Sequence, residues 1–210
     1  MQVTLCKEPF EYIIIDNTYT EKELKLIFLE LDFWSISNNL MGPEHTGTAK
    51  WEDGTPKKKN KGVFLDDAYR DRKYSNILNL NRKIYQIQLD QPSVVLNFLK
   101  ESNHDTTLLS YYENESKYKS HKDCSIFTAM TYLYKQPKAF EGGNLILTDY
   151  GYQFEPWFNR TYIIPGVVEH EVTEVTMKQE DCGKGLGRYC ISNFIHRDRP
   201  EIREQISNPV

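Results

Sequence analysis

The chain has 210 residues, of which 39% are hydrophobic and 27% charged, and its formal net charge is −4. A chain of this length can bury one substantial core, so we expect one domain over residues 1–210, and the charged fraction argues against a membrane-embedded surface. The negative charge disfavours generic binding to nucleic-acid phosphates.

The first residues of the chain lack the apolar run of a signal peptide, and no segment approaches the roughly 18 to 20 apolar residues that span a bilayer, so we expect a cytoplasmic location.

The N-terminal half is expected to hold one strand followed by helices. Residues 11–16 form an apolar run that is typical of a buried strand. Thr20 and Glu23 have the spacing of a capping box, which predicts a helix to about residue 34. Amphipathic patterns predict helical structure over residues 66–90, with a break allowed near residues 79–81, and a shorter helix over 94–100.

Residues 41–62 are rich in glycine, proline, lysine and other polar residues, which predicts a long loop of the kind that often serves as a lid. Four lysines in this segment, Lys57, Lys58, Lys59 and Lys61, form a dense basic cluster. We interpret them as part of a solvated loop, and a contact with nucleic acid or with an acidic substrate is the alternative.

The second half changes to short β-branched and aromatic runs separated by turn residues, which are typical of strands. Six closely spaced strands predict a sandwich or barrel, so we expect an α+β protein with a mainly β core. The predicted strands cover residues 108–112, 126–134, 144–149, 160–164, 171–176 and 188–195.

The cysteines and three of the histidines have no partner at ligand spacing in the sequence. No CxxC pair is present, so the cysteines are interpreted as free thiols rather than as a zinc site or a disulfide framework. His45, His104 and His196 are interpreted as surface residues. For Trp51 and Trp157, a place in a substrate groove and a structural role both stay open.

A His-x-Asp pair and a distant histidine form a candidate metal site. His121 and Asp123 are two residues apart, so in an extended chain both side chains leave the same face. Such a pair alone is common, but His170 opens another strand-like run in the same half and could supply a second imidazole. Two histidines and one aspartate form a facial triad that leaves three positions of octahedral Fe(II) open, whereas zinc usually keeps a tetrahedral site. The pattern therefore favours iron.

A buried cation is needed if the open positions bind an oxoacid with two carboxylates, because an unpaired buried carboxylate is costly. Arg188 is the candidate for this cation. It opens a strand-like run in which alternation places Arg188, Cys190, Ser192 and Phe194 on one face. Its guanidinium can pair bidentately with a carboxylate, and Ser192 could add a hydrogen bond.

The motifs of the second half occur in a defined order. Two tyrosines precede a His-x-Asp pair in residues 112–123, a Thr-Tyr-Leu-Tyr run follows at 131–134, and a Gly-Gly-x-Leu turn lies in 141–145. A His-x-Val run at 170–172 and a strand that begins with a basic residue at 188–191 complete the series. This order resembles the prolyl 4-hydroxylase-like branch of the Fe(II)/2-oxoglutarate oxygenases.

The resemblance covers about residues 108–196 and implies a double-stranded β-helix, or jelly roll, in that part, with supporting helices over about residues 1–107. It implies a dioxygenase that releases succinate and CO2 as it hydroxylates a substrate C–H, with Fe(II) as cofactor, 2-oxoglutarate and O2 as co-substrates and ascorbate as a candidate reductant. A peptidyl proline is the expected substrate, so a peptide or protein is the expected partner. The alternatives are a free amino acid or other small molecule, a nucleic-acid base, and a catalytically silent binding module.

The predicted site residues are the iron ligands His121, Asp123 and His170 and the 2-oxoglutarate-binding residues Arg188, Tyr132, Tyr112 and Ser192. By the resemblance, Tyr132 would bind the distal carboxylate beside Arg188. The family's basic anchor usually lies closer to the distal histidine than Arg188 does, so Lys178 and Lys184 stay open as alternative anchors. We interpret residues 179–187, which separate Arg188 from the histidine, as an extended hairpin loop.

Overall fold

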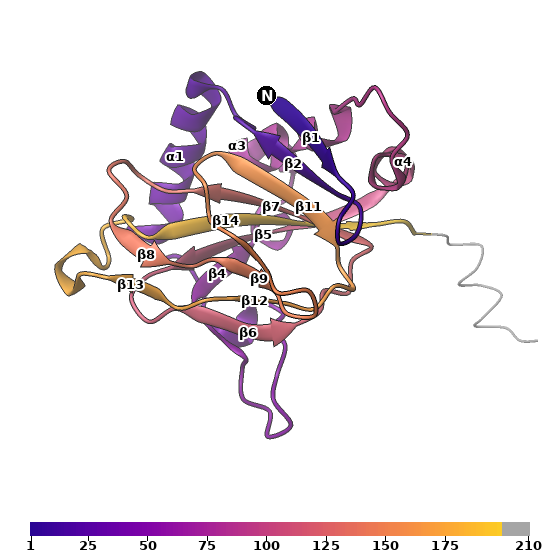
Figure 1. Ribbon diagram of the computed structural model, residues 1–210. Coiled ribbons are helices and arrows are strands. Elements are labelled where there is room, and N and C mark those ends of the chain that lie inside the picture. Colours follow the sequence, from indigo (N-terminus) through magenta and orange to yellow (C-terminus); the bar gives the residue numbers. More distant parts are fainter. Residues whose placement is uncertain (199–210) are drawn as a thin grey trace, which may run out of the picture.

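The computed structural model describes residues 1–198, in which two facing β-sheets form a jelly roll with helices against one side (Figure 1). The larger sheet has seven strands in the order β1-β2-β11-β7-β14-β5-β4, and all its neighbouring pairs are antiparallel. Its strands in that order are β1 (Gln2–Cys6), β2 (Tyr12–Asp16), β11 (Arg160–Pro165), β7 (Phe127–Leu133), β14 (Arg188–His196), β5 (His104–Tyr112) and β4 (Lys61–Phe64).

The smaller sheet has five strands in the order β10-β9-β12-β6-β3, and β8 and β13 form a separate pair. These strands are β10 (Tyr152–Phe154), β9 (Leu145–Leu147), β12 (His170–Val172), β6 (Lys117–His121), β3 (Lys58–Lys59), β8 (Phe140–Gly142) and β13 (Val175–Met177). Tyr132 and Cys190 from the larger sheet pack in one buried cluster with Leu145, Leu147 and Val172 from the smaller sheet. The facing sheets confirm the predicted jelly roll with supporting helices.

The longest helix, α1 (Glu21–Ser35), begins where the sequence predicts it. The Thr20 side chain accepts a hydrogen bond from Glu23 N, and the Glu23 carboxylate accepts one from Thr20 N at 2.7 Å. Two N–H groups that would lack intrahelical partners are thereby satisfied, which is the physical role of a capping box. The predicted capping box is therefore confirmed.

Strand β14 has two chemically different faces, as its alternation predicts. Tyr189 and Ile191 are fully buried and pack in a cluster with residues of α1 on the outer side of the larger sheet. Arg188, Cys190 and Ser192 point to the inner side, toward the smaller sheet. One strand therefore contributes both to the support of the sheet and to the space between the sheets.

The helical pattern predicted over residues 66–90 is divided into several short helices, and one of the divisions lies between Leu80 and Asn81, inside the predicted break. The Asp71 side chain accepts a hydrogen bond from Lys73 N, and the Ser75 side chain accepts one from Leu78 N, so each starts a new helical segment. The segments are α2 (Leu65–Ala68), η2 (Arg72–Tyr74), α3 (Asn76–Leu80) and η3 (Asn81–Gln86), and the helix predicted over 94–100 is α4 (Val94–Glu101).

Residues 41–62 are not only a loop, contrary to the prediction. They contain the short helix η1 (Pro43–His45) and strand β3, and they run into β4. The intervening chain projects from the molecule (Figure 1, purple, bottom) and turns back where Trp51 N donates to Thr55 O at 2.9 Å. Gly54 has a φ of 83° at this turn, a conformation that favours glycine. The two ends of the segment pair with each other, because Met41 N donates to Gly62 O at 2.9 Å and Gly62 N donates to Met41 O at 2.9 Å.

The structure has more strands than the seven predicted, one at residues 11–16 and six in the second half. Strands β1, β3, β4, β6, β8 and β10 are short or polar and were not predicted, and the run at 171–176 is divided between β12 and β13. Residues 179–187 include η4 (Gln179–Asp181) and join β13, which pairs with β8, to β14, which pairs with β5 and β7. The prediction of a hairpin loop over 179–187 is therefore wrong, because the two strands that it joins are not paired.

The N-terminal half contributes more than supporting helices. β1, β2 and β4 all lie within the first 107 residues and all belong to the larger sheet.

No helix among residues 1–198 is long and apolar enough to cross a membrane. The expectation of one domain extends over residues 199–210, which lie outside the described part, and it stays a prediction.

Candidate active site

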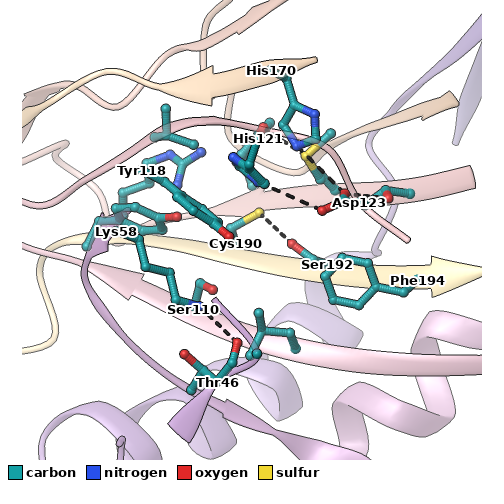
Figure 2. Close-up of a pocket in the computed structure, with 18 of the residues that line it drawn as sticks. Thr46, Lys58, Ser110, Tyr118, His121, Asp123, His170, Cys190, Ser192 and Phe194 are labelled. Carbon is teal, nitrogen blue, oxygen red and sulfur yellow. Dashed lines mark hydrogen bonds and ion pairs between the residues drawn. The ribbon is translucent and has the colours of Figure 1, made fainter. Parts of the chain in front are cut away.

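A cavity between the two sheets brings the predicted site residues together (Figure 2). Side chains from β5, β7 and β14 of the larger sheet and from β6 and β12 of the smaller sheet line it. All seven residues predicted to bind iron or 2-oxoglutarate are among them. These are Tyr112, His121, Asp123, Tyr132, His170, Arg188 and Ser192.

The His-x-Asp pair and the distant histidine meet because β6 and β12 are neighbours. His121 ends β6, His170 begins β12, and the antiparallel register places the two opposite each other, with ring centres 4.4 Å apart. Asp123 Oδ1 lies 3.8 Å from His121 Nε2, and Asp123 Oδ2 lies 3.7 Å from His170 Nε2. One ligand atom from each residue lies within 4.8 Å of the other two. The three side chains therefore converge on one point.

Backbone carbonyls orient both imidazoles. His121 Nδ1 lies 2.9 Å from Lys119 O, and His170 Nδ1 lies 2.8 Å from Val168 O. Because a carbonyl only accepts, each Nδ1 carries the proton and each Nε2 presents a lone pair toward Asp123. Burial, followed by the nearby His170, lowers the pKa of His121 to about 3. Both effects favour the neutral imidazole that a metal ligand requires.

Two further contacts hold the Asp123 carboxylate and its backbone. Thr128 Oγ1 donates to Asp123 Oδ2 at 2.7 Å, and Asp123 N donates to Gly166 O at 2.9 Å. The Thr128 hydroxyl also lies 2.7 Å from Ser125 Oγ. Hydrogen bonds to a ligating carboxylate fix its orientation, so Thr128 is a positioning residue that the sequence analysis did not identify.

The donor set fits a divalent iron ion. Two imidazoles and one carboxylate, from His121, His170 and Asp123, face one another in a buried cavity, and each is oriented by a hydrogen bond. This is the ligand set of sites that keep further octahedral positions open. The buried surroundings also limit access of water to those positions.

Arg188 is buried, with 1% of its surface exposed, and lies between two aromatic rings. Its guanidinium carbon lies 4.6 Å from the centre of the Tyr112 ring and 4.5 Å from that of Tyr132. Among residues 1–198, no hydrogen-bond partner is present for Arg188 Nε or Nη1. A buried cation with free donors is costly unless an anion binds it, so the site fits a carboxylate. Lys178 and Lys184 are exposed and do not line the cavity.

The other predicted oxoacid-binding residues surround this guanidinium. Burial raises the pKa of Tyr112 and of Tyr132 well above the usual tyrosine value, so both hydroxyls stay protonated and can donate. The hydroxyl of Tyr132 lies 3.8 Å from Met130 Sδ, a weak acceptor. Ser192 Oγ lies 3.4 Å from the sulfur of Cys190. These hydroxyls therefore have donor capacity left for a ligand.

Tyr118 and Lys58 also line the cavity, and the sequence analysis gave neither a role in the site. The Tyr118 ring stacks on the His121 ring with centres 3.5 Å apart, and the Tyr118 hydroxyl accepts a hydrogen bond from Ala49 N.

Lys58 was interpreted as part of a solvated loop. That interpretation is wrong, because Lys58 is 5% exposed and lines the cavity. Burial lowers the pKa of Lys58 to about 8. Pairing of β3 with β6 places Lys58 in the cavity, and nothing in a run of lysines predicts that pairing.

The residues with no assigned role lie outside the cavity. His45 and His104 are exposed, and His196 is half-buried with its ring centre 5.8 Å from that of His104. Trp51 is 50% exposed and Trp157 is 54% exposed, and neither lines the cavity.

The free thiols predicted from the sequence are present at Cys6, Cys124, Cys182 and Cys190, and Cys190 lines the cavity.

A jelly roll with a buried His-Asp-His cluster defines the class of non-haem iron oxygenases. Residues 107–196 match the model of the 2OG-Fe(II) oxygenase superfamily. The chain therefore contains, at residues 107–196, a domain of the 2OG-Fe(II) oxygenase superfamily, as the sequence motifs indicated. It is a dioxygenase whose cofactor and co-substrate, implied by the superfamily and the cluster, are Fe(II) and 2-oxoglutarate. No curated protein matches the chain significantly.

Solved structures of prolyl hydroxylases share the fold. One, from Trichoplax adhaerens in complex with a peptide fragment of the hypoxia inducible factor oxygen degradation domain, has a TM-score of 0.62 and 13% identity over 94% of this chain and 87% of that chain. A prolyl-4-hydroxylase from Pseudomonas putida has a TM-score of 0.57 and 14% identity over 90% and 93% of the two chains. A viral collagen prolyl hydroxylase from Paramecium Bursaria Chlorella virus-1 has a TM-score of 0.53 and 12% identity over 88% and 94%. At these identities the likeness concerns the fold alone.

Proposed function

We propose that the chain is a hydroxylase that holds Fe(II) with His121, Asp123 and His170 and anchors the distal carboxylate of 2-oxoglutarate with Arg188. The observation that carries the proposal is the buried guanidinium of Arg188, whose Nε and Nη1 have no partner among residues 1–198 and which lines the same cavity as the His-Asp-His cluster. A metal site alone would not need a second, cationic site for a carboxylate. A dicarboxylate whose other end chelates the metal needs both.

The chain's own residues bind and orient the reactants. Bound Fe(II) supplies O2 activation, through which 2-oxoglutarate is oxidised to succinate and CO2 and a substrate C–H is hydroxylated. Arg188 binds the distal carboxylate, while the rings of Tyr112 and Tyr132 exclude water from it and their hydroxyls donate hydrogen bonds. Ser192 faces the same space and adds a hydroxyl donor.

For the substrate we propose a peptidyl proline. The support is the ordered set of motifs in the second half and the fold that the chain has in common with prolyl hydroxylases. A peptide or protein is then the partner, with ascorbate as the reductant that restores Fe(II). The projecting segment of residues 41–62 lies at the cavity through Thr46 and Lys58, which suits a role in substrate selection, since binding residues concentrate on loops mounted on rigid strands.

Other substrates are alternatives to proline in a peptide. A free amino acid or another small molecule would use the same cavity. A nucleic-acid base is disfavoured by the net charge of −4, and the inward position of Lys58 removes one lysine from the basic cluster that kept this alternative open. A catalytically silent binding module is the alternative outside enzymology.

Anaerobic visible absorption of the protein, titrated with Fe(II) and 2-oxoglutarate, tests the proposed site. We expect a charge-transfer band that requires both components, and we expect His121→Ala and His170→Ala to abolish it. His45→Ala, which removes an exposed histidine outside the cavity, is the matched control and should keep the band. If both components bind and no band forms, the oxoacid does not chelate the metal and the binding-module alternative is favoured.

Incubation with proline-containing peptides, 2-oxoglutarate and O2 then tests the substrate. The expected product carries a mass gain of one oxygen atom on proline, with succinate formed in equal amount. Succinate release that depends on a small molecule or a nucleic acid, and on none of a varied set of prolyl peptides, would replace proline by that substrate class.

A further inference from the structure

Lys58 differs from the lysines on either side of it because strand β3 turns it inward. It pairs with Tyr118 of β6 and is 5% exposed, whereas the side chain of Lys59 is 62% exposed and forms an ion pair with Glu115. Lys58 Nζ donates to Thr46 O at 3.0 Å. Figure 2 shows the Lys58 side chain running past Tyr118 toward Thr46, on the opposite side of Tyr118 from the histidines.

The ammonium group of Lys58 keeps binding capacity. An ammonium has three donors, and Thr46 O is its one hydrogen-bond acceptor among residues 1–198. No carboxylate of the described chain forms an ion pair with Lys58, although the neighbouring Lys59 has one. A buried ammonium without an anionic partner carries a desolvation cost that a bound anion would offset.

The charges of the loaded cavity leave Lys58 without a counter-charge. Apart from the two ligand histidines, Asp123, Lys58 and Arg188 are the ionisable acid and base side chains with full charges among the described residues that line it. Asp123 and the two carboxylates of 2-oxoglutarate carry three negative charges, which Fe(II) and Arg188 balance with three positive ones. The ammonium of Lys58 is then the remaining charge in a space of low dielectric, where an unbalanced charge attracts an anion strongly.

Apolar side chains form another part of the wall of this cavity. Phe64 of β4, Leu108 of β5 and Phe194 of β14 line the cavity with Lys58, and the rings of Phe64 and Phe194 have centres 6.3 Å apart. Ser110 adds one hydroxyl. A ligand that fits here combines an apolar body with one negatively charged group.

We propose that Lys58 binds a carboxylate of the primary substrate, so that the enzyme selects substrates that carry a carboxylate. The inference rests on the proposed function, since it assigns a substrate class to the same cavity. Two sources supply this chemistry: the carboxylate of a terminal or free amino acid, and an acidic side chain beside the target residue in a peptide. In both, the ammonium pairs with the carboxylate while the apolar wall contacts the body of the substrate.

The test uses the full chain loaded anaerobically with Fe(II) and 2-oxoglutarate, with perturbation of its charge-transfer band as a measure of substrate binding. The first pair of probes is N-acetyl-L-proline and its neutral amide. The second pair is an N-acetylated, C-terminally amidated Pro-Glu dipeptide and the same dipeptide with Gln. We expect the acid of at least one pair to bind about tenfold or more tightly than its neutral partner, and the pair that discriminates identifies the source of the carboxylate.

The variants attribute this preference to one side chain. Lys58→Gln should reduce the ratio of acid to neutral binding to about one, Lys58→Arg should keep a preference for the acid, and Lys59→Gln, which removes the exposed neighbouring charge, should leave the ratio unchanged. Thermal unfolding checks that each variant is folded, and Lys58→Met, which keeps an unbranched side chain without the charge, carries the test if Lys58→Gln does not fold. Equal binding within both pairs, including no binding of any probe, would overturn the inference, as would a preference that survives Lys58→Gln. Absence of the band itself is a different result, because it refutes the proposed function.

Discussion

At the scale of single residues, the site depends on side chains whose polar atoms have no partner within the described chain. Arg188 Nε and Nη1 are the clearest case, because they are buried against Tyr112 and Tyr132 and yet form no hydrogen bond with residues 1–198. Native proteins rarely leave buried polar groups unpaired without a functional reason. The free donors of Arg188 therefore point to a ligand rather than to a structural ion pair.

Arg188→Ala should weaken 2-oxoglutarate binding about 30-fold or more, because removal of one partner of a buried charge pair costs about 2 kcal/mol or more. Arg188→Lys should bind 2-oxoglutarate with intermediate affinity, since it keeps the charge and loses the bidentate geometry. The measurement is the dissociation constant of 2-oxoglutarate for the Fe(II)-loaded protein. Lys178→Ala is the control, because Lys178 is exposed and pairs with Glu180. Normal affinity in Arg188→Ala together with weak binding in Lys184→Ala would move the anchor to Lys184.

At the scale of elements, the turn between β8 and β9 controls the position of Arg188. Gly142 and Gly143 have φ values of 72° and 70°, a conformation that side chains disfavour. A Cβ on Gly143 would lie 2.7 Å from Arg188 Cδ and 3.0 Å from Val175 Cγ2. The Gly-Gly-x-Leu motif is therefore needed for packing against the arginine as well as for the turn.

Gly143→Ala should weaken 2-oxoglutarate binding about tenfold or more, because the added methyl group displaces the stem of Arg188. Gly151→Ala is a matched control: its φ is 67°, and a Cβ there would meet nothing within 4 Å. Both variants carry the backbone cost of about 1 to 2 kcal/mol for a left-handed alanine, so urea unfolding should show a similar loss of stability from this cause. Equal effects of the two variants on 2-oxoglutarate affinity would contradict a specific contact between Gly143 and Arg188.

At the scale of the whole molecule, the jelly roll is built around many buried tyrosines. Burial raises the pKa of tyrosines on both faces of the larger sheet and at the helices, and for Tyr69 the value is about 12. In the unfolded chain these groups ionise near pH 10. The group includes Tyr19, Tyr85, Tyr111, Tyr112, Tyr132 and Tyr189.

The free energy of unfolding should therefore fall as the pH rises above about 10. Above that pH the unfolded chain loses its tyrosine protons while the folded chain keeps them, so ionisation stabilises the unfolded state. Lys58 has the opposite sign, because burial lowers its pKa to about 8, but it is one group against several. Urea unfolding at a series of pH values measures the trend.

Tyr19→Phe provides the internal test of this pH dependence. It removes a fully buried hydroxyl and should flatten the fall by about 1.4 kcal/mol per pH unit, the value for one proton. Tyr74→Phe is the control, because Tyr74 is 65% exposed, and it should follow the parent protein. A parent stability that stays constant between pH 9 and 12 would show that tyrosine ionisation does not limit the fold.

The local features of this protein follow from the sequence alone. The capping box at Thr20 predicts the start of α1, and the alternation in β14 places Arg188 and Ser192 on one face while Tyr189 packs on the other. The approach of His121, Asp123 and His170 was also predicted, and the structure brings their ligand atoms together. Each of these predictions depends on spacing over a few residues or on an ordered set of motifs, which the chain carries in its primary structure. That the three residues bind iron stays a prediction.

The remaining features are decided by pairing between distant segments. The inward position of Lys58 depends on β3 joining β6, about 60 residues further along the chain, and the lysine-rich sequence itself indicates a solvated loop. The unpaired donors of Arg188 and its crowding by Gly143 likewise exist only once β14 and the turn after β8 are packed together. Local pattern determines which way a side chain points within its element, whereas the register between elements determines what it meets there. The sequence by itself therefore determined the fold class and seven of the residues that line the candidate site, and the tertiary structure added Thr128, Tyr118 and Lys58 to them.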